Sequence, residues 1–472
     1  MPEPTESMKK NTTLTLFNYD FDAIGFGRVF AAEGVAAADH AGFDLFSFPS
    51  NAKLVFFDME RMVNQLAAKA QAAGWQAVVS SHEQFGALTA ALLAERMGWP
   101  GTPVNAVLAC QHKLYAREVL NRLCPEASLQ AQVLDAEYGA PIPTGLRYPV
   151  FVKPIKAAFS VLAKQVGSPQ ELHQHTRFGL WELWVIRHLV EPFERVFQKR
   201  LPGHASAHRL MLEETVNAQQ FNLDGFVWKG QASRLGVVDA VMYPGTQAFM
   251  RWDYPSRLLA PVQQRALQYA QKFLCEIGFD HGLFNMEFFY DEATDKLTII
   301  EFNPRMASQF SDLYQRVDGI DLHGMALALA QGQHPETARR HRPTARVASS
   351  LVYRHFDAVG AYDSVTMPAR QQVTQAKAAF PDLLLMPFPK DKVSIARDFK
   401  WLGSYRYGIA HLGGRNWADL QSRARRLSDL LGWPTPYVEA KARKVRHARA
   451  GALTRLTESL TPLMTPIGKP KT

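Results

Sequence analysis

The chain has 472 residues, a net charge of +9, 47% hydrophobic and 21% charged residues, a composition typical of a soluble globular protein. This length predicts two or three structural units, and the lack of a run of about eighteen apolar residues predicts no transmembrane helix. Three cysteines, odd in number and widely spaced, form neither a disulfide framework nor a zinc pattern. We therefore expect a reduced, cytoplasmic protein.

Much of the positive charge lies in the tail, in the segment KARKVRHARAGALTRL that begins at Lys441. This segment lacks interleaved aromatic residues, and no nucleic-acid-binding signature occurs elsewhere in the chain. We therefore predict no nucleic-acid partner and no membrane partner, and interpret the tail as a solvated helix or a fraying end. A cleft that binds polyphosphate also requires positive charge, which leaves that kind of site open.

The first 110 residues alternate strands and helices at a spacing typical of a parallel α/β sheet. A dinucleotide site is weakly supported, because the segment after the first strand contains only Gly25 and Gly27. Glu83 follows the third strand, at a position where such sheets hold ligands, but we favour a role for it at the helix N-terminus. The predicted strands are 13–19, 54–57 and 77–81, and the predicted helices are 27–40, 61–73 and 82–97.

The middle of the chain contains two lysines at positions suited to phosphate. Lys113 lies in a helix predicted over 106–123. Lys153 ends a strand over 148–153 and precedes the loop 155–160, whose amides could add further donors. A lysine at a strand end is often simply solvated, so Lys153 alone decides nothing. Further strands are predicted at 209–216, 221–227 and 235–242, and a helix at 261–278.

A hairpin over 283–305 is the most informative stretch of the sequence. Strand side chains alternate between faces, and if Glu287 stands opposite Glu301, then Asn285 stands opposite Asn303. Opposed residues have Cβ atoms roughly 4.5–5.5 Å apart, so two carboxylates there repel unless one is protonated or a cation lies between them. Mg²⁺ suits such oxygen ligands and leaves positions open for phosphates.

The same alternation predicts that Leu297 and Ile299 share a face with Glu301. Arg305, just beyond the second strand, adds a planar cation that can bind phosphate through two donors. The alternative is an amphipathic hairpin with a solvated acidic face, and these residues alone leave both interpretations open. Beyond the hairpin, a helix over 321–329 and a polar linker over 333–344 lead to a final α/β segment with a strand at 405–411 and a helix at 416–431.

Taken in order, these motifs resemble the ATP-grasp superfamily, whose members activate a carboxylate with ATP and couple it to an amine or a similar nucleophile. The resemblance extends from about residue 77 to residue 332. It implies that Glu287, Glu301 and Asn303 hold the magnesium ions that bridge the ATP phosphates. It also implies that Arg305 is catalytic and contacts the transferred phosphate and the acyl-phosphate.

The resemblance also implies a set of residues that bind ATP. The nucleotide lysines are Lys113 and Lys153, and the segment that meets adenine contains Glu213, Glu214 and Val216. Gln220 replaces an acid that often binds ribose, and Ser160 lies in the loop over the phosphates. The closest branch is that of the amino-acid and dipeptide ligases.

Three features depart from the family pattern. The loop 155–160 lacks the usual glycines and is expected to be stiffer. Gln220 replaces an acid, which weakens a hydrogen bond to ribose without removing it. Met306-Ala307-Ser308 replaces the paired glycines near the acceptor substrate, so the sequence specifies the ATP chemistry better than it specifies the substrates.

The predicted fold class is α/β, with α+β character in the grasp lobes. We expect a Rossmann-like N-terminal parallel α/β sheet domain over 1–110, a two-lobed ATP-grasp core over 111–335, a small C-terminal α/β lobe over 345–435 and a basic tail over 436–472. The predicted activity is an ATP-dependent ligase that activates a carboxylate as an acyl-phosphate and joins it to an amine, releasing ADP and phosphate.

The predicted cofactors are ATP and Mg²⁺, with Mn²⁺ as an alternative metal, and the predicted partners are a small-molecule carboxylate and an amine. A homodimer is a possible assembly. Two other functions remain open from the sequence: a bicarbonate-activating carboxylase, and an ATP-binding sensor or scaffold without turnover.

Overall fold

The computed structural model describes residues 12–35, 39–45, 50–134, 142–157, 162–356 and 365–437. These described residues belong to one compact unit. Ser160 and the basic tail from residue 438 onward therefore lie outside the described residues. Within the described ranges, no helix is long and apolar enough to cross a membrane. The domain boundaries given above stay predictions.

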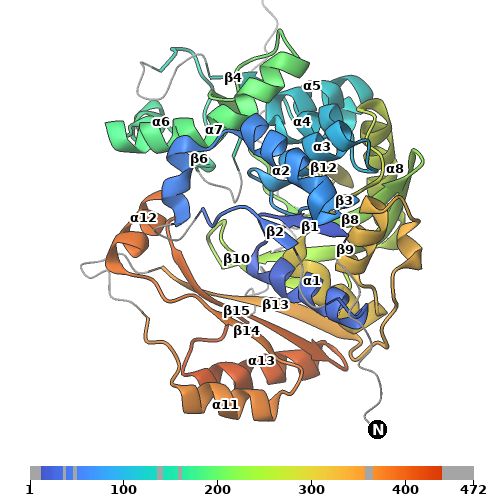
Figure 1. Cartoon of the computed structure of the whole chain (residues 1–472). Helices are drawn as coiled ribbons and strands as arrows, with labels where there is room; N and C mark the ends of the chain where they lie inside the picture. Colours follow the sequence, from blue (N-terminus) through green and yellow to red (C-terminus); the bar gives the residue numbers. More distant parts are fainter. Residues whose placement is uncertain are drawn as a thin grey trace, which may run out of the picture. The chain divides into compact units, whose positions relative to one another are not determined.

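The N-terminal sheet has three parallel strands in the order β2-β1-β3, as expected for a parallel α/β sheet (Figure 1). Its core is formed by apolar residues of these strands and of the helices that follow them, among them Leu14, Val78 and Leu88. The strands are β1 (Thr13–Leu16), β2 (Asp39–Ala41) and β3 (Ala77–Val79), and the helices are α1 (Asp20–Ala32), α2 (Met59–Ala73) and α3 (Gly86–Met97).

Two predictions for this region are wrong. The helix expected over 27–40 begins at Asp20, where the Asp22 carboxylate accepts a hydrogen bond from the Tyr19 backbone N–H (3.1 Å). The strand expected over 54–57 belongs instead to a 3₁₀ helix, Ser50–Phe56, and β2 is the second strand. A run of four apolar residues cannot distinguish a strand from a helical turn, because it is too short to reveal a period.

A four-stranded antiparallel sheet follows, in the order β4-β7-β5-β6. The single helix expected over 106–123 is two helices, because the backbone is extended at His112, whose ring accepts a hydrogen bond from the Tyr115 N–H (3.1 Å) and caps the second helix. The strands are β4 (Ala131–Val133), β5 (Val150–Pro154), β6 (Lys164–Val166) and β7 (Leu210–Glu213), and the helices are α4 (Val104–Gln111), α5 (Lys113–Leu123), α6 (Pro169–Thr176) and α7 (Leu180–Arg200).

The largest sheet has eight strands in the order β12-β11-β8-β9-β10-β13-β15-β14, and all neighbouring strands are antiparallel. It contains the predicted hairpin, and β12 forms one edge. The C-terminal strands continue this sheet. The strands are β8 (Gln219–Trp228), β9 (Gln231–Met242), β10 (Phe249–Tyr254), β11 (Gly282–Asp291), β12 (Lys296–Asn303), β13 (Val347–His355), β14 (Leu384–Pro387) and β15 (Tyr405–Gly414).

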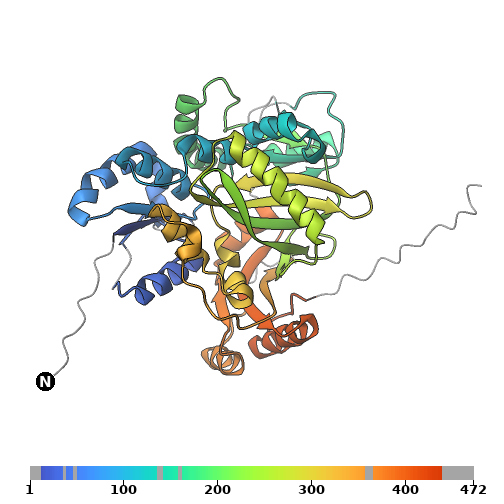
Figure 2. The ribbon, with the colours of Figure 1, turned by 90° about the vertical axis from the view of Figure 1, so that its right-hand side faces the viewer.

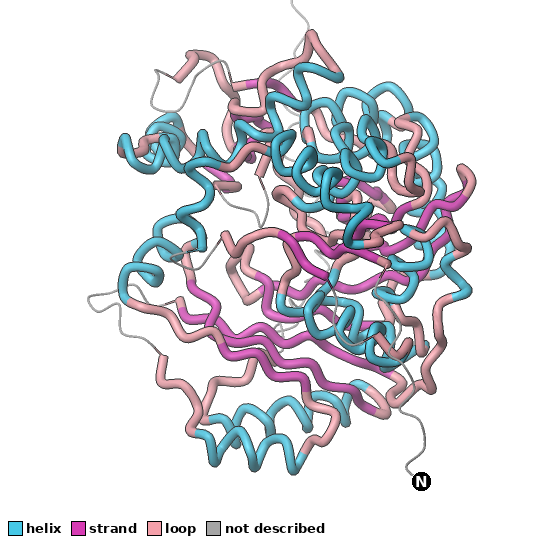
Figure 3. The backbone as a smooth tube through the Cα atoms, in the orientation of Figure 1, coloured by secondary structure: helices cyan, strands magenta, loops and turns pink. Residues whose placement is uncertain are grey.

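Helices cover this sheet at both ends. Helix α8 (Ala260–Glu276) lies across the strands of the hairpin half (Figure 2), where Phe273 stacks on Phe302 with ring centroids 4.2 Å apart. At the other end, α11 (Arg370–Ala379) and α13 (Trp417–Leu431) lie side by side along β13 and β15 (Figure 3). The remaining helices are α9 (Ser311–Asp318), α10 (Leu322–Ala330) and α12 (Lys392–Leu402).

Candidate active site

The two acids of the hairpin stand opposite each other, as predicted. Glu287 on β11 pairs with Glu301 on β12, and Asn285 pairs with Asn303. The Asn303 amide nitrogen lies 3.2 Å from the Asn285 side-chain oxygen and 3.4 Å from Glu287 Oε1. On the neighbouring strand, Gln220 donates to Glu287 Oε2 over 2.7 Å. One face of the sheet therefore presents two carboxylates among amide groups.

A β-bulge decides which side chains of β12 reach this face. Glu287 pairs with Glu301 but the next residue, Phe288, pairs with Ile299, so Ile300 is an extra residue in β12. The expectation that Leu297 and Ile299 share a face with Glu301 is therefore wrong, because both are buried in the core that contains Phe288. An extra residue inverts the alternation of faces along the strand. Glu301 consequently points to the polar face, opposite to the apolar face that Leu297 and Ile299 occupy.

The two opposed acids hold their protons differently. Burial, and then the nearby Glu301 carboxylate, raise the pKa of Glu287 to about 7. Burial also acts to raise the pKa of Glu301, but Lys113 and Lys153 outweigh it and the net direction is downward. Lys113 Nζ lies 3.1 Å from Glu301 Oε2. Without a metal, the raised pKa of Glu287 therefore favours its protonated form, and the lowered pKa of Glu301 favours its ionised form.

The donor set suits Mg²⁺ that is shared with a nucleotide. Mg²⁺ in such sites usually takes one or two carboxylates and completes its shell with phosphate oxygens and water. Glu287 and Glu301 would supply the carboxylates, and the Asn303 side chain an amide oxygen. Among the described residues, no group of three or more His, Cys, Asp or Glu could hold a metal ion alone.

A buried ion network adjoins the acids. Lys153 Nζ lies 2.7 Å from Glu213 Oε2, and the Arg117 guanidinium lies 3.0 Å from Glu213 Oε1. The side chains of all three are at most 5% exposed. Burial raises the pKa of Glu213, but Lys153 and Arg117 outweigh it, and the carboxylate stays ionised. The sequence analysis missed Arg117, although its spacing of four residues from Lys113 on α5 places both on one helix face.

The predicted ATP-binding residues separate into two groups. Glu214 and Val216 line a cavity of about 200 Å³, together with Phe289 and Thr298 of the hairpin. Glu213 is not among the residues that line this cavity. Its carboxylate faces Lys153, just as Gln220 faces Glu287. The cavity is of a size to receive a planar base, whereas Glu213 and Gln220 hold other side chains of the site.

A third charged group lies after the carboxyl end of β3. Glu83 Oε2 lies 3.0 Å from Arg305 Nε. Lys156 Nζ donates to the Glu83 backbone carbonyl over 3.1 Å and lies 3.9 Å from Glu83 Oε1. Burial, partly offset by Glu83, lowers the pKa of Lys156 to about 8. The prediction that Glu83 serves the N-terminus of α3 is wrong, because α3 begins at Gly86 and the carboxylate faces Arg305.

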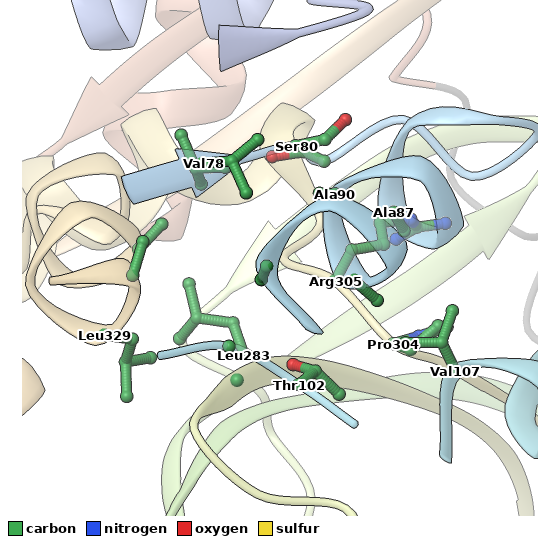
Figure 4. A pocket seen from close by; sticks show the side chains of 18 of the residues that line it. Val78, Ser80, Ala87, Ala90, Thr102, Val107, Leu283, Pro304, Arg305 and Leu329 are labelled. Carbon is green, nitrogen blue, oxygen red and sulfur yellow. The ribbon is translucent and has the colours of Figure 1, made fainter. Parts of the chain in front are cut away.

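Arg305 also borders a smaller cavity of about 80 Å³ between β3, α3 and α10 (Figure 4). Its walls are mostly apolar and include Val78, Ala90, Leu283 and Leu329. This lining offers no set of charges for phosphate.

Comparison with sequence models of known families matches one segment of the chain. Residues 246–337 match the sequence model of the family described as "Carbamoyl-phosphate synthase L chain, ATP binding domain". Comparison with curated proteins by sequence gives no match.

Three solved structures are similar over nearly the whole chain. The first is an L-amino acid ligase from Bacillus licheniformis, with 14% identity, coverage of 90% of this chain and 98% of that chain, and a TM-score of 0.62. The second is a carboxyaminoimidazole ribonucleotide synthase from Aspergillus clavatus in complex with ATP, with 13% identity, coverage of 89% of this chain and 98% of that chain, and a TM-score of 0.58. The third is a biotin carboxylase from Campylobacter jejuni, with 14% identity, coverage of 89% of this chain and 91% of that chain, and a TM-score of 0.57.

At these identities the likeness establishes the fold alone, which is shared by a ligase, a synthase and a carboxylase. The synthase structure is described as a complex with ATP, and the biotin carboxylase structure as a β,γ-ATP complex. The segment matched by sequence, residues 246–337, contains the hairpin with Glu287 and Glu301. This match and the shared fold agree with the resemblance to the ATP-grasp superfamily that the motifs carry.

Proposed function

We propose that this chain is an ATP-dependent ligase that converts a carboxylate into an acyl-phosphate and joins it to an amine, releasing ADP and phosphate. The observation that carries the proposal is the register of the hairpin, which sets Glu287 opposite Glu301 on the polar face of β11 and β12. Two partly buried acids so arranged repel each other unless a cation or a proton lies between them. Lys113 and Lys153 stand beside them, as a polyphosphate site requires.

The chain's own residues would overcome the repulsion between ATP and a carboxylate. Bound Mg²⁺ would neutralise phosphate charge, and Glu287, Glu301 and Asn303 would hold it. Lys113 and Lys153 would orient the phosphates, and the cavity beside Glu214 and Val216 would take the base. Fixed charges of this kind supply most of the acceleration in phosphoryl transfer, because they need no rearrangement during the reaction.

The second substrate site would lie between Arg305 and Lys156. Both cations face the single Glu83 carboxylate, so these three side chains together carry a net charge of +1. A substrate carboxylate would supply the missing anion. Its oxygen would attack the γ-phosphorus of ATP and release ADP. The amine would then attack the acyl carbon, so that a C–N bond forms, the C–O bond to phosphate breaks, and the amine loses a proton.

The test is a screen of carboxylate and amine pairs, with bicarbonate included, for Mg-ATP-dependent release of phosphate. Hydroxylamine in a parallel reaction traps an acyl-phosphate as a hydroxamate, whichever amine the enzyme uses. The expected products are ADP and phosphate, and Glu301→Ala is the inactive control. AMP as product would contradict the acyl-phosphate route. Turnover with bicarbonate alone would indicate a carboxylase, and nucleotide binding without release would indicate a sensor.

A further inference from the structure

Arg117 makes an unusual set of contacts for a buried side chain. Its Nη1 donates to the backbone carbonyl of Ile299 and its Nη2 to that of Ile300, both over 2.8 Å. Its Nε donates to Glu213 over 3.0 Å, and Nη1 also approaches the Ser128 hydroxyl at 3.4 Å. The side chain is only 2% exposed. Every nitrogen of the guanidinium is therefore engaged.

The two carbonyls belong to the bulge that turns Glu301 toward Glu287. A bulge interrupts the ladder of hydrogen bonds, and β12 is an edge strand with no further strand to receive its carbonyls. Buried carbonyl groups without partners are costly, so such a bulge needs a donor from elsewhere. Arg117 supplies a planar pair of donors to two successive carbonyls, a geometry that an ammonium group cannot provide.

The same guanidinium also reaches the lysine side of the site. Glu213 accepts from Arg117 through Oε1 and faces Lys153 through Oε2. Lys113, one helical turn before Arg117 on α5, pairs with Glu301 itself. Two residues on one face of α5 therefore hold Glu301. Lys113 contacts its carboxylate, and Arg117 contacts the backbone just before it.

We infer that Arg117 is a positioning residue that fixes the β12 bulge, and thereby Glu301, for the metal, and that it ties this bulge to the strand holding Lys153. This inference rests on the proposed Mg-nucleotide site. It predicts that a substitution of Arg117 can affect metal binding without affecting nucleotide binding. Losing the planar donor pair should impair metal binding, while a retained positive charge should keep Glu213 and Lys153 in place.

The test compares Arg117→Lys with Arg122→Lys, the same substitution on the same helix at a side chain that is 63% exposed. Mn²⁺ binding is followed by the electron paramagnetic resonance signal of the free ion, in the presence of a non-hydrolysable ATP analogue. Nucleotide affinity without metal is measured with a fluorescent ATP analogue in EDTA. Arg117→Lys should require about tenfold more Mn²⁺, as expected when a group that supports a metal ligand is lost. Its metal-free nucleotide affinity should stay close to that of the wild type and of Arg122→Lys.

A general packing role would lower both affinities together, along with the melting temperature, and would overturn the inference. An unchanged Mn²⁺ requirement would overturn it as well, while leaving the proposed function intact. If the wild type itself bound no nucleotide, both would fail.

A second variant keeps the test decisive if Arg117→Lys does not fold. Glu213→Gln retains the contacts of Arg117 with the bulge but removes the partner charge of Lys153. It should weaken metal-free nucleotide binding and leave the Mn²⁺ requirement near that of the wild type. If Glu213→Gln raised the Mn²⁺ requirement as strongly as it weakened nucleotide binding, the proposed division of roles would be wrong.

Discussion

The hairpin β11–β12 and the cluster around Glu83 both gather buried charge, but they hold it by different means. In the hairpin, Glu287 and Glu301 face each other because two strands are paired in a fixed register. In the cluster, Glu83, Lys156 and Arg305 each come from a connecting segment rather than from within a helix or strand. The comparison teaches that the predicted phosphate chemistry depends on sheet geometry, whereas the predicted substrate choice depends on loops, which change more easily.

The largest effect on activity is expected when one of the two acids is removed from the hairpin. Glu301→Gln should lower ligase turnover by about a thousandfold, because it removes a charge from the site where phosphate charge must be stabilised. The fold should persist, as judged by circular dichroism. Glu292→Gln, at an exposed position in the same hairpin, is the matched control and should retain full activity. Turnover that survived in Glu301→Gln would remove this residue from the metal site.

The proposed role of Lys153 in binding ATP beside the hairpin can be tested by removing its charge. Lys153→Ala should weaken ATP binding roughly ten- to hundredfold, the range expected for one lost charge-assisted hydrogen bond. Glu213 would keep Arg117 as its partner, so the fold should tolerate the change. Isothermal titration with the non-hydrolysable ATP analogue measures the effect, with Lys199→Ala, at an exposed position of α7, as the control. An affinity equal to that of the wild type would exclude Lys153 from the nucleotide site.

The Glu83 cluster is tested through Lys156. Lys156→Met should raise the KM for the carboxylate substrate about tenfold, because a single buried charge contact is lost. The KM for ATP should change little, unlike that of Lys153→Ala. Lys164→Met, at an exposed position of β6, is the control. If the KM for ATP rose instead of the KM for the carboxylate, Lys156 would belong to the nucleotide site.

The smallest expected effect concerns pH. The proton that Glu287 binds with a pKa of about 7 competes with the metal, so metal affinity should fall as pH falls. Between pH 8 and pH 6.5, Mn²⁺ binding should weaken about fourfold, as simple competition with one proton predicts. A flat profile in the spin-resonance titration would mean that Glu287 is already ionised.

The same raised pKa affects the metal-free protein. Between about pH 4.5 and pH 7 the folded chain holds a proton on Glu287 that the unfolded chain has lost. The free energy of unfolding should therefore decrease as pH rises through this window. Urea titrations without metal check the sign, and Glu287→Gln should remove this part of the pH dependence.

The sequence revealed the register of the acids but not the bulge beside them. Glu287 and Glu301 could be paired because polar and apolar residues alternate along β11. Ile299 and Ile300 are chemically identical, so nothing in the sequence indicated which of them would be the extra residue. Arg117 could be placed on the face of Lys113 by helical spacing, but its partners lie 96 and 182 residues away, and only tertiary structure brings them together.

Local ambiguity explains the other errors. Residues 54–57 are apolar, and the last three of them are β-branched or aromatic, which suits a strand. However, Phe56 is 82% exposed at the end of a 3₁₀ helix. The helix break at His112 was hidden because the residues on both sides favour helix. The fold class was predictable because it depends on the order of many elements, and single misassigned elements do not change that order.

The continuity of the large sheet limits how the protein can be divided. Strand β13 pairs with β10, so the backbone hydrogen bonds run from the acidic hairpin through to β14. A shortened chain that stopped before Arg346 would expose the open side of β10, and open strand edges recruit other chains. Such a fragment should self-associate and precipitate, so expression of the ATP-binding half alone will require the last strands to be retained.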